Sequence, residues 1–112
     1  MRYNSDGTLD GSFDGDGKLT TDFGASEDHA NSVVLQTDGK ILAAGYSSSA
    51  GNVDFALVRY NSDGSLDVPF GADGRIKTDF GAADFAYSVA IQTDGRIVVA
   101  GNRSGVFALA LK

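Results

Sequence analysis

The chain contains one histidine, His29, and no cysteine, so few of its side chains are suited to catalysis. A catalytic triad needs a nucleophile, a general base and a group that orients the base, all within hydrogen-bonding reach. His29 is predicted to lie in a loop, and the second half of the chain has no histidine to match it. We interpret His29 as a solvated residue and expect that the protein is not an enzyme.

Aspartate-rich turns are a second candidate for chemistry, because calcium is bound by carboxylate oxygens. The segment with Asp14 and Asp16 resembles a calcium loop, but such a loop of about 12 residues ends in a bidentate acid. Phe23 stands at that position here. Aspartate side chains in turns also bond their own backbone, which accounts for these residues without a metal. We expect no cofactor and keep calcium as an alternative, with the candidate ligands Asp6, Asp10, Asp14, Asp16, Asp63 and Asp67.

Aromatic and polar residues near the ends of predicted strands are a third candidate. They are Tyr46, Tyr87, Asn102 and Arg103. Tyrosine with amide and guanidinium groups is suited to a carbohydrate or protein ligand, because a tyrosine combines an apolar ring with a hydrogen-bonding hydroxyl. The structural alternative is that the tyrosines only cover the edges of the sheets.

The composition limits the possible partners. The net charge is −6, and the nine lysines and arginines are spread along the chain, so we expect neither nucleic acid nor an anionic membrane as a partner. No apolar run approaches the roughly 18 residues of a membrane helix. Met1 and Arg2 are followed by polar residues, so no signal peptide is predicted. The sequence alone leaves the localisation open.

Two tandem copies of one repeat make up the chain, which we treat as a single unit of residues 1–112. Repeat one covers about 2–58 and repeat two about 59–112. The second copy is shorter near Glu27 and near Ser49, which predicts loops at both places. The clearest matches pair residues 2–10 with 59–67, 21–24 with 78–81, and 36–41 with 92–97.

Each repeat predicts four short strands and no helix. Asp38-Gly39 separates two apolar runs, as expected of a hairpin, and a serine-rich loop is predicted from Ser47 to Asn52. The aspartate of Thr21-Asp22-Phe23-Gly24 is expected to bond backbone amides of the following turn. In the first full repeat, the predicted strands are 32–36, 40–46, 54–60 and 75–80.

The burial pattern favours sheets that are covered on both sides. Residues 41–45 and 97–101 are apolar on both faces, and Phe55 and Leu57 point to the opposite side from Ala56 and Val58. A repeat of four strands with such faces is typical of the blade of a β-propeller. We therefore predict an all-β protein, a β-propeller with two four-stranded blade repeats per chain. A two-sheet sandwich is the competing fold.

The repeated segments 40–45, 55–67 and 78–81 resemble the delta-sixty repeat family of bacterial β-propeller repeats, and the resemblance covers essentially the whole chain. It implies a propeller fold in proteins that carry many copies and are often secreted or attached to the cell surface. It supplies no catalytic residues. The chain departs from the pattern in its number of copies, and Leu111-Lys112 stands where an Arg-Tyr pair is expected.

One blade is predicted to be split between the two ends of the chain. Its fourth strand comes first, at residues 18–23, and its other three strands come last, up to residue 111. Because a blade buries its apolar faces only against neighbouring blades, we expect a neighbouring subunit to complete it. The predicted subunit interface comprises Lys18, Leu19, Thr20, Thr21, Phe23, Phe107, Leu109 and Leu111.

The expected function is that of a non-catalytic structural or binding module. Head-to-tail self-assembly would give a closed ring or a filament, and a ring would hold an even number of blades. Six or eight blades are favoured within the usual range of about four to eight. The alternatives are a lectin-like carbohydrate-binding propeller, a fragment of a longer secreted multi-repeat protein, or a chain engineered from a natural repeat.

Overall fold

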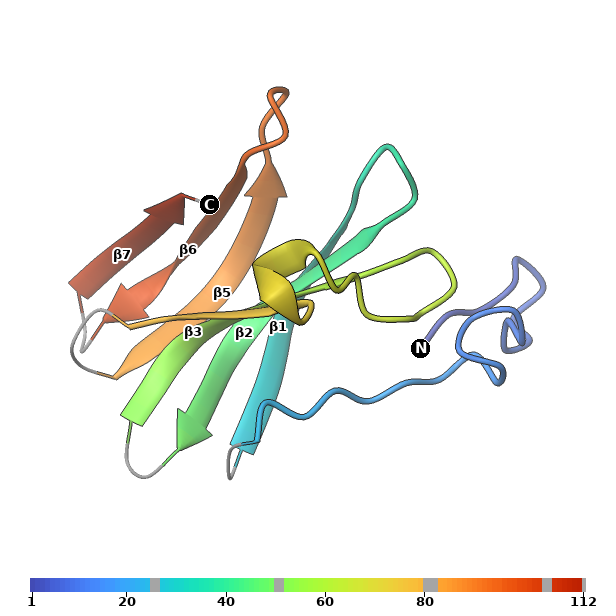
Figure 1. Cartoon of the computed structure of the whole chain (residues 1–112), viewed down its shortest axis with the longest axis horizontal. Coiled ribbons are helices and arrows are strands. Elements are labelled where there is room, and N and C mark those ends of the chain that lie inside the picture. The colour runs from blue at the N-terminus through green and yellow to red at the C-terminus, as the bar shows by residue number, and fades with distance from the viewer. Residues whose placement is uncertain (25–26, 50–51, 80–82, 104–105, 112) are drawn as a thin grey trace.

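Two antiparallel sheets follow one another along the chain (Figure 1). The computed structural model describes residues 1–24, 27–49, 52–79, 83–103 and 106–111, with β7 and the end of β6 described by their backbone. The first sheet contains β1 (Glu27–Leu35), β2 (Ile41–Ser49), β3 (Asn52–Tyr60) and β4 (Arg75–Thr78). The second contains β5 (Asp84–Ile91), β6 (Ile97–Arg103) and β7 (Val106–Leu111). The short 3₁₀ turn η1 (Phe70–Ala72) precedes β4, so the prediction of an all-β chain is confirmed.

The strands of the two sheets pair in the same register. Val33 lies opposite Ala43 in the first sheet, as Val89 lies opposite Val99 in the second. Both first strands carry a bulge at the same place, between Ala30 and Ser32 and between Ala86 and Ser88. The duplication of the sequence is therefore also a duplication of the structure, down to its irregularities.

Two predicted loops are wrong in extent. β1 begins at Glu27, so His29 lies within a strand, opposite Tyr46, and not in a loop. The predicted serine-rich loop is largely paired, because β2 continues to Ser49 and β3 starts at Asn52. Backbone hydrogen bonds can extend a hairpin whatever the polarity of its side chains. The polar residues at the ends of these strands therefore predict loops where the backbone is in fact paired.

The hydrophobic core lies between the sheets, which pack face to face. Phe55 and Leu57 of β3 point into it, as predicted, with Leu42 and Ala44 of β2. The second sheet supplies Ala86, Val89, Ile97 and Val99, and η1 supplies Phe70. The Asn31 side chain also donates a hydrogen bond of 2.7 Å to the Ala86 carbonyl, which joins the two bulges.

Residues 18–23, the predicted fourth strand of the split blade, are in no strand of this chain. They form an extended segment that leads to the start of β1 (Figure 1). The hydroxyls of Thr21 and Tyr60 share a hydrogen bond, and the Arg75 guanidinium donates to the Asp22 carbonyl. The Asp22 carboxylate accepts a 2.7 Å hydrogen bond from the Gly24 N–H, as predicted for this motif. The part of the chain that the structure describes contains no helix that could span a membrane.

Candidate functional site

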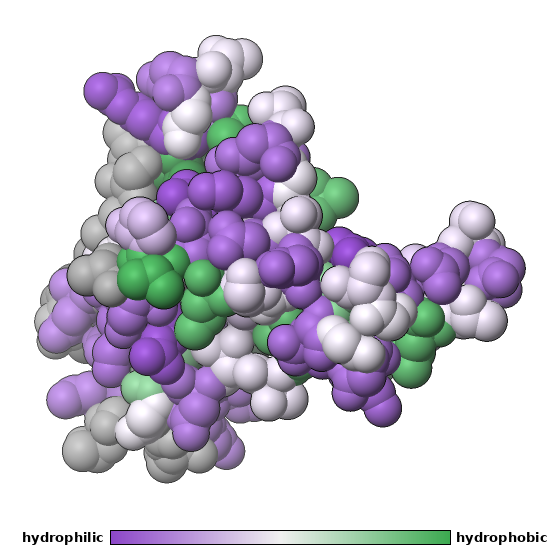
Figure 2. All heavy atoms as spheres, turned by 45° about the vertical axis from the view of Figure 1, so that its right-hand side comes forward, coloured by the Kyte–Doolittle hydropathy of each residue, from purple (hydrophilic) through white to green (hydrophobic). Residues whose placement is uncertain are grey.

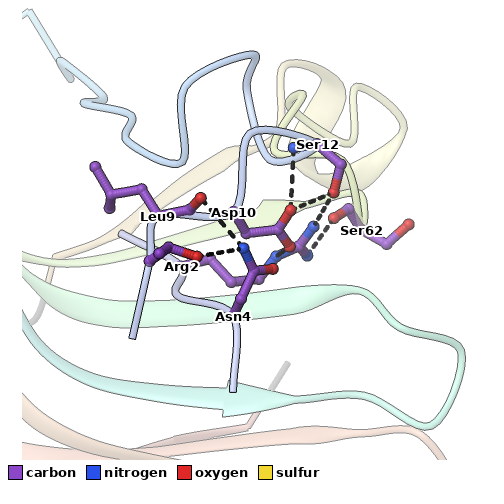
Figure 3. A network of polar contacts seen from close by, with 7 residues as sticks. Arg2, Asn4, Leu9, Asp10, Ser12 and Ser62 are labelled. Atoms are coloured by element: carbon purple, nitrogen blue, oxygen red, sulfur yellow. Dashed lines mark hydrogen bonds and ion pairs between the residues drawn. The ribbon is translucent and has the colours of Figure 1, made fainter. Parts of the chain in front are cut away.

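Two loops of the same construction stand beside the sheets. We call residues 2–17 the N-terminal loop and residues 59–74 the central loop. In the N-terminal loop, Arg2 Nε lies 2.8 Å from Asp10 Oδ2, and the guanidinium lies 4.7 Å from the centre of the Phe13 ring (Figure 3). In the central loop, Arg59 Nε lies 2.7 Å from Asp67 Oδ2 and its guanidinium 4.3 Å from the Phe70 ring. The arginine closes each loop by binding the carboxylate and covering the ring.

Asp67 differs from Asp10 because it binds a second cation. Lys40 Nζ, from the β1–β2 turn, lies 3.0 Å from the same Asp67 oxygen, and the Asp67 side chain is only 5% exposed. Asp10 is 22% exposed and instead accepts hydrogen bonds from the N–H and hydroxyl of Ser12. The hydrogen bonds from Lys40 and Arg59 lower the pKa of Asp67 below its usual value, although burial opposes them.

We expect Asp67→Asn to lower the melting temperature at pH 7 more than Asp10→Asn does. The substitution leaves two cations facing a neutral amide at a buried position. Because the folded-state pKa of Asp67 is lowered, its contribution is complete above the unfolded-state value, near 4. It is lost as the pH falls through the folded-state pKa. The difference between wild type and Asp67→Asn should therefore shrink on acidification, and equal losses for both variants at pH 7 would contradict the assignment.

The other predicted calcium ligands are engaged in their own turns. Asp6 Oδ1 accepts hydrogen bonds from the Thr8 N–H and hydroxyl, at 3.0 and 2.6 Å. Asp63 is bound in the same way by Ser65, at 2.9 and 2.6 Å, and Asp16 accepts from the Lys18 N–H. Asp14 lies at a turn with a φ of 53°. Across the described ranges, these four do not gather with Asp10 and Asp67 into a carboxylate cluster, and calcium there stays a prediction.

A cluster of three carboxylates that sequence reasoning missed lies where the two sheets meet. Asp54 is the third residue of β3, Asp79 follows β4 and Asp84 starts β5, and one oxygen of each lies within 4.8 Å of the others. Burial, followed by the charge of Asp79, raises the pKa of Asp54 above its usual value. Oxygen ligands of this kind suit a hard cation such as calcium. Their spacing in the sequence is irregular, so only the repeat frame, which matches Asp79 to Asp22 and Asp84 to Asp28, offered a signal.

Tyr46, one of the predicted ligand-binding residues, is packed among aromatic rings. Its ring stacks on His29 at 4.6 Å between centroids and meets the edge of Phe85 at 4.7 Å. Asn102 pairs with Phe85 along the backbone, so it lies at the same end of the sheets. Arg103 pairs there with Asp84, and its side chain lies outside the described part. Tyr87 is 51% exposed at the β5 bulge.

A cavity of about 200 Å³ opens beside this aromatic group. It lies between the segment 18–23, which contributes Leu19, Thr21 and Phe23, and the first sheet, which contributes His29, Tyr46 and Asp28. Burial raises the pKa of Asp28, but hydrogen bonds from the Phe23 N–H and the Ser47 hydroxyl outweigh it and lower the pKa overall. The cavity combines an aromatic wall with a carboxylate, which suits a small polar ligand.

On the side of the first sheet that faces away from the core, Ala56, Val58 and Tyr60 of β3 are buried, but apolar residues of β1 and β2 form a surface that is partly exposed. We call this surface, made by Val33, Leu35, Ile41 and Ala43, the open face. Val33 is 65% and Leu35 70% exposed. The open face borders a groove of about 480 Å³ to which Met1 and Phe13 also contribute. Figure 2 likewise shows hydrophobic residues at the surface among hydrophilic ones.

A family model described as a β-propeller domain of unknown function, DUF5122, matches residues 1–13, 36–70 and 92–111. These ranges contain both Arg-Asp pairs and the strands β2, β3, β6 and β7. No curated protein matches the chain. The matched family agrees with the predicted propeller fold, while the finer resemblance to delta-sixty repeats stays a prediction.

Proposed function

Since the chain belongs to the DUF5122 β-propeller family, we propose that it is a non-catalytic module that associates head to tail with further copies of itself. The assembled propeller is its working form and offers its rim to a ligand. The His29 ring stacks on Tyr46, and its Nε2 lies 3.7 Å from a carboxylate oxygen of Glu27. We take both contacts as structural, in keeping with a non-catalytic module.

The open face is the observation that carries this proposal. In the second sheet, the residues equivalent to the open face are Val89, Ile91, Ile97 and Val99, and they pack against the first sheet. Val89 is 8% exposed, whereas Val33, in the same register position, is 65% exposed. The equivalent positions are therefore mostly buried in the second sheet, whereas in the first sheet Val33 and Leu35 are exposed and Ile41 and Ala43 half-buried. An exposed apolar face of this kind is typical of an interaction site.

In the proposed assembly, the segment 18–23 completes the second sheet of a neighbouring copy. β4, its counterpart in the next repeat, pairs with β3 so that Phe55 lies opposite Thr78 and Leu57 opposite Ile76. Applied to the second sheet, this register sets Phe107 opposite Thr21 and Leu109 opposite Leu19. The interface predicted from the sequence follows from this pairing. A longer chain with more repeats would supply the same pairing within one polypeptide.

Native mass spectrometry of the 112-residue chain tests this proposal. A ring built from chains with two repeats holds an even number of blades, and we favour six or eight, within the range of about four to eight known for propellers. Three or four chains per particle are the expected result. A soluble, folded monomer at micromolar concentration would contradict self-association.

A lectin-like function is the second candidate, and the cavity beside Tyr46 and Asp28 favours it. An aromatic wall next to a carboxylate is suited to a sugar, because the ring packs on the apolar face and the carboxylate accepts hydrogen bonds. A glycan array probed with the assembled protein discriminates the two functions. Binding that Tyr46→Ala abolishes would support the lectin, and an array without signal would exclude it for the sugars tested.

A further inference from the structure

We infer that Arg96 of one copy binds Asp10 of the next and thereby sets the register of head-to-tail association. This inference rests on the association proposed above and names the contact that directs it. The partner is a second copy of this chain. Two equivalent positions in the repeats support the inference. In one, Lys40 and Asp67 form an ion pair within the chain; in the other, the equivalent residues Arg96 and Asp10 lie apart in the same chain.

The complete interaction joins the first sheet to the central loop. Lys40, at the end of the β1–β2 turn, reaches Asp67 at 3.0 Å, and Asp67 also holds Arg59. The loop lies close against this turn, since a Cβ placed on Gly39 would be 3.5 Å from the Ser62 side chain. Two cations thus meet one nearly buried carboxylate.

The two halves lie at opposite ends of the chain. In the second sheet, Arg96 takes the place of Lys40, within the matching run Gln92-Thr93-Asp94-Gly95-Arg96. Its nearest charged partner among the described residues is its own neighbour Asp94, at 3.7 Å, and its side chain is 65% exposed. A Cβ placed on Gly95 would meet nothing within 4 Å. The position that the central loop occupies beside Gly39 is therefore open beside Gly95.

The N-terminal loop has the shape and charge to fill that place. Its Asp10 matches Asp67 but holds one cation, Arg2, where Asp67 holds two. The loop is already oriented by the central loop, because Arg2 Nη1 donates to the Ser62 carbonyl at 2.6 Å and the Asp14 N–H donates to the Asp63 carbonyl at 2.7 Å. Figure 3 shows Arg2 reaching both Asp10 and Ser62. The central loop packs against the β1–β2 turn of its own chain. If the N-terminal loop of one copy packed in the same way against the β5–β6 turn of another copy, its Asp10 would face Arg96 of that copy.

The net charge of the chain favours the Arg96–Asp10 pairing over a contact without such a charge pair. The protein is acidic overall, so two copies repel each other unless cations meet carboxylates at the contact. A charge pair at an interface suppresses misaligned partners and fixes the register, while apolar burial supplies most of the affinity. Here the open face would supply the affinity, and the Arg96–Asp10 pair would select the alignment.

Carbodiimide coupling of an Arg96→Lys variant tests the contact directly. The reagent joins an amine to a carboxylate that touches it, and the substitution gives position 96 the same amine that Lys40 carries. Copies labelled with ¹⁴N and ¹⁵N are mixed, coupled and digested, and the linked peptides are identified by mass. The Lys40–Asp67 amide within the chain is the positive control.

We expect a linked peptide that contains residues 96 and 10, with one half from each label. An assembly that yields the Lys40–Asp67 amide but no amide between position 96 and Asp10 would overturn the inference. This result can be told apart from a failure of the association itself, because the particle mass of the wild type is measured first.

The charge reversal Arg96→Glu gives a second measurement. It should raise the dissociation constant between copies by about ten- to a hundredfold, because two carboxylates would then face each other. The melting temperature of the isolated chain should hardly change, since the Arg96 side chain is mostly exposed. Unchanged association for Arg96→Glu, with a normal melting temperature, would also overturn the inference.

Discussion

Replacing Gly45 with alanine should destabilise the fold by about 3 kcal/mol or more, a large part of the roughly 5–15 kcal/mol that holds a small domain together. Gly45 lies opposite the β1 bulge, and a Cβ placed there would be 1.7 Å from the His29 carbonyl oxygen. No side-chain rotation relieves this clash, because the backbone fixes the position of the Cβ and the carbonyl oxygen belongs to the backbone. The bulge would have to open, and the sheet with it. Chemical denaturation followed by circular dichroism measures the loss.

Gly101 and Gly7 provide the matched comparisons. Gly101 lies in the same place in the second sheet, where an added Cβ would be 1.9 Å from the Phe85 carbonyl oxygen, so Gly101→Ala should cost a similar amount. Gly7 has a φ of +90° and nothing within 4 Å of an added Cβ. Gly7→Ala should therefore cost only the roughly 1 kcal/mol of a left-handed alanine. If Gly45→Ala lowered the stability as little as Gly7→Ala does, the close approach of Gly45 to the His29 carbonyl across the bulge would be contradicted.

Placing two glutamates on the open face, by Val33→Glu with Leu35→Glu, should abolish association between copies. Burying a valine or a leucine contributes about 1.5–3 kcal/mol each, so their loss weakens binding at least about a hundredfold. Two unpaired carboxylates at the contact weaken it further. Particle mass and sedimentation measured over a range of concentrations report the change. The single chain should keep its sheets, because both side chains are mostly exposed in it.

Val68→Glu is the control for the open-face variant. Val68 is 59% exposed in the central loop and lies outside the open face, so the same kind of substitution there should leave the particle mass unchanged. A double variant at Val33 and Leu35 that still assembles would show that the contact lies elsewhere. Loss of assembly with Val68→Glu as well would point to charge in general and not to this surface.

The repeat, the strands and the side of each strand that enters the core can be predicted from the order of the residues. The alternation of Phe55 and Leu57 with Ala56 and Val58 predicts that the two larger side chains share one face, and they lie in the core with Leu42. Short turns such as Asp38-Gly39 can also be predicted, because glycine readily adopts a positive φ, and the φ of Gly39 is 88°. These features are local, so neighbouring residues alone specify them.

Which distant groups meet depends on the packing of the strands and loops against one another. The polar residues around His29 predict a loop, but His29 lies in β1, because pairing with β2 extends the strand beyond its apolar residues. The carboxylates of Asp54, Asp79 and Asp84 come together only where the two sheets stack. The pairing of Lys40 with Asp67 depends on how a loop folds back against a turn 27 positions earlier in the chain. Such contacts arise from packing between elements, and no local spacing of residues encodes them.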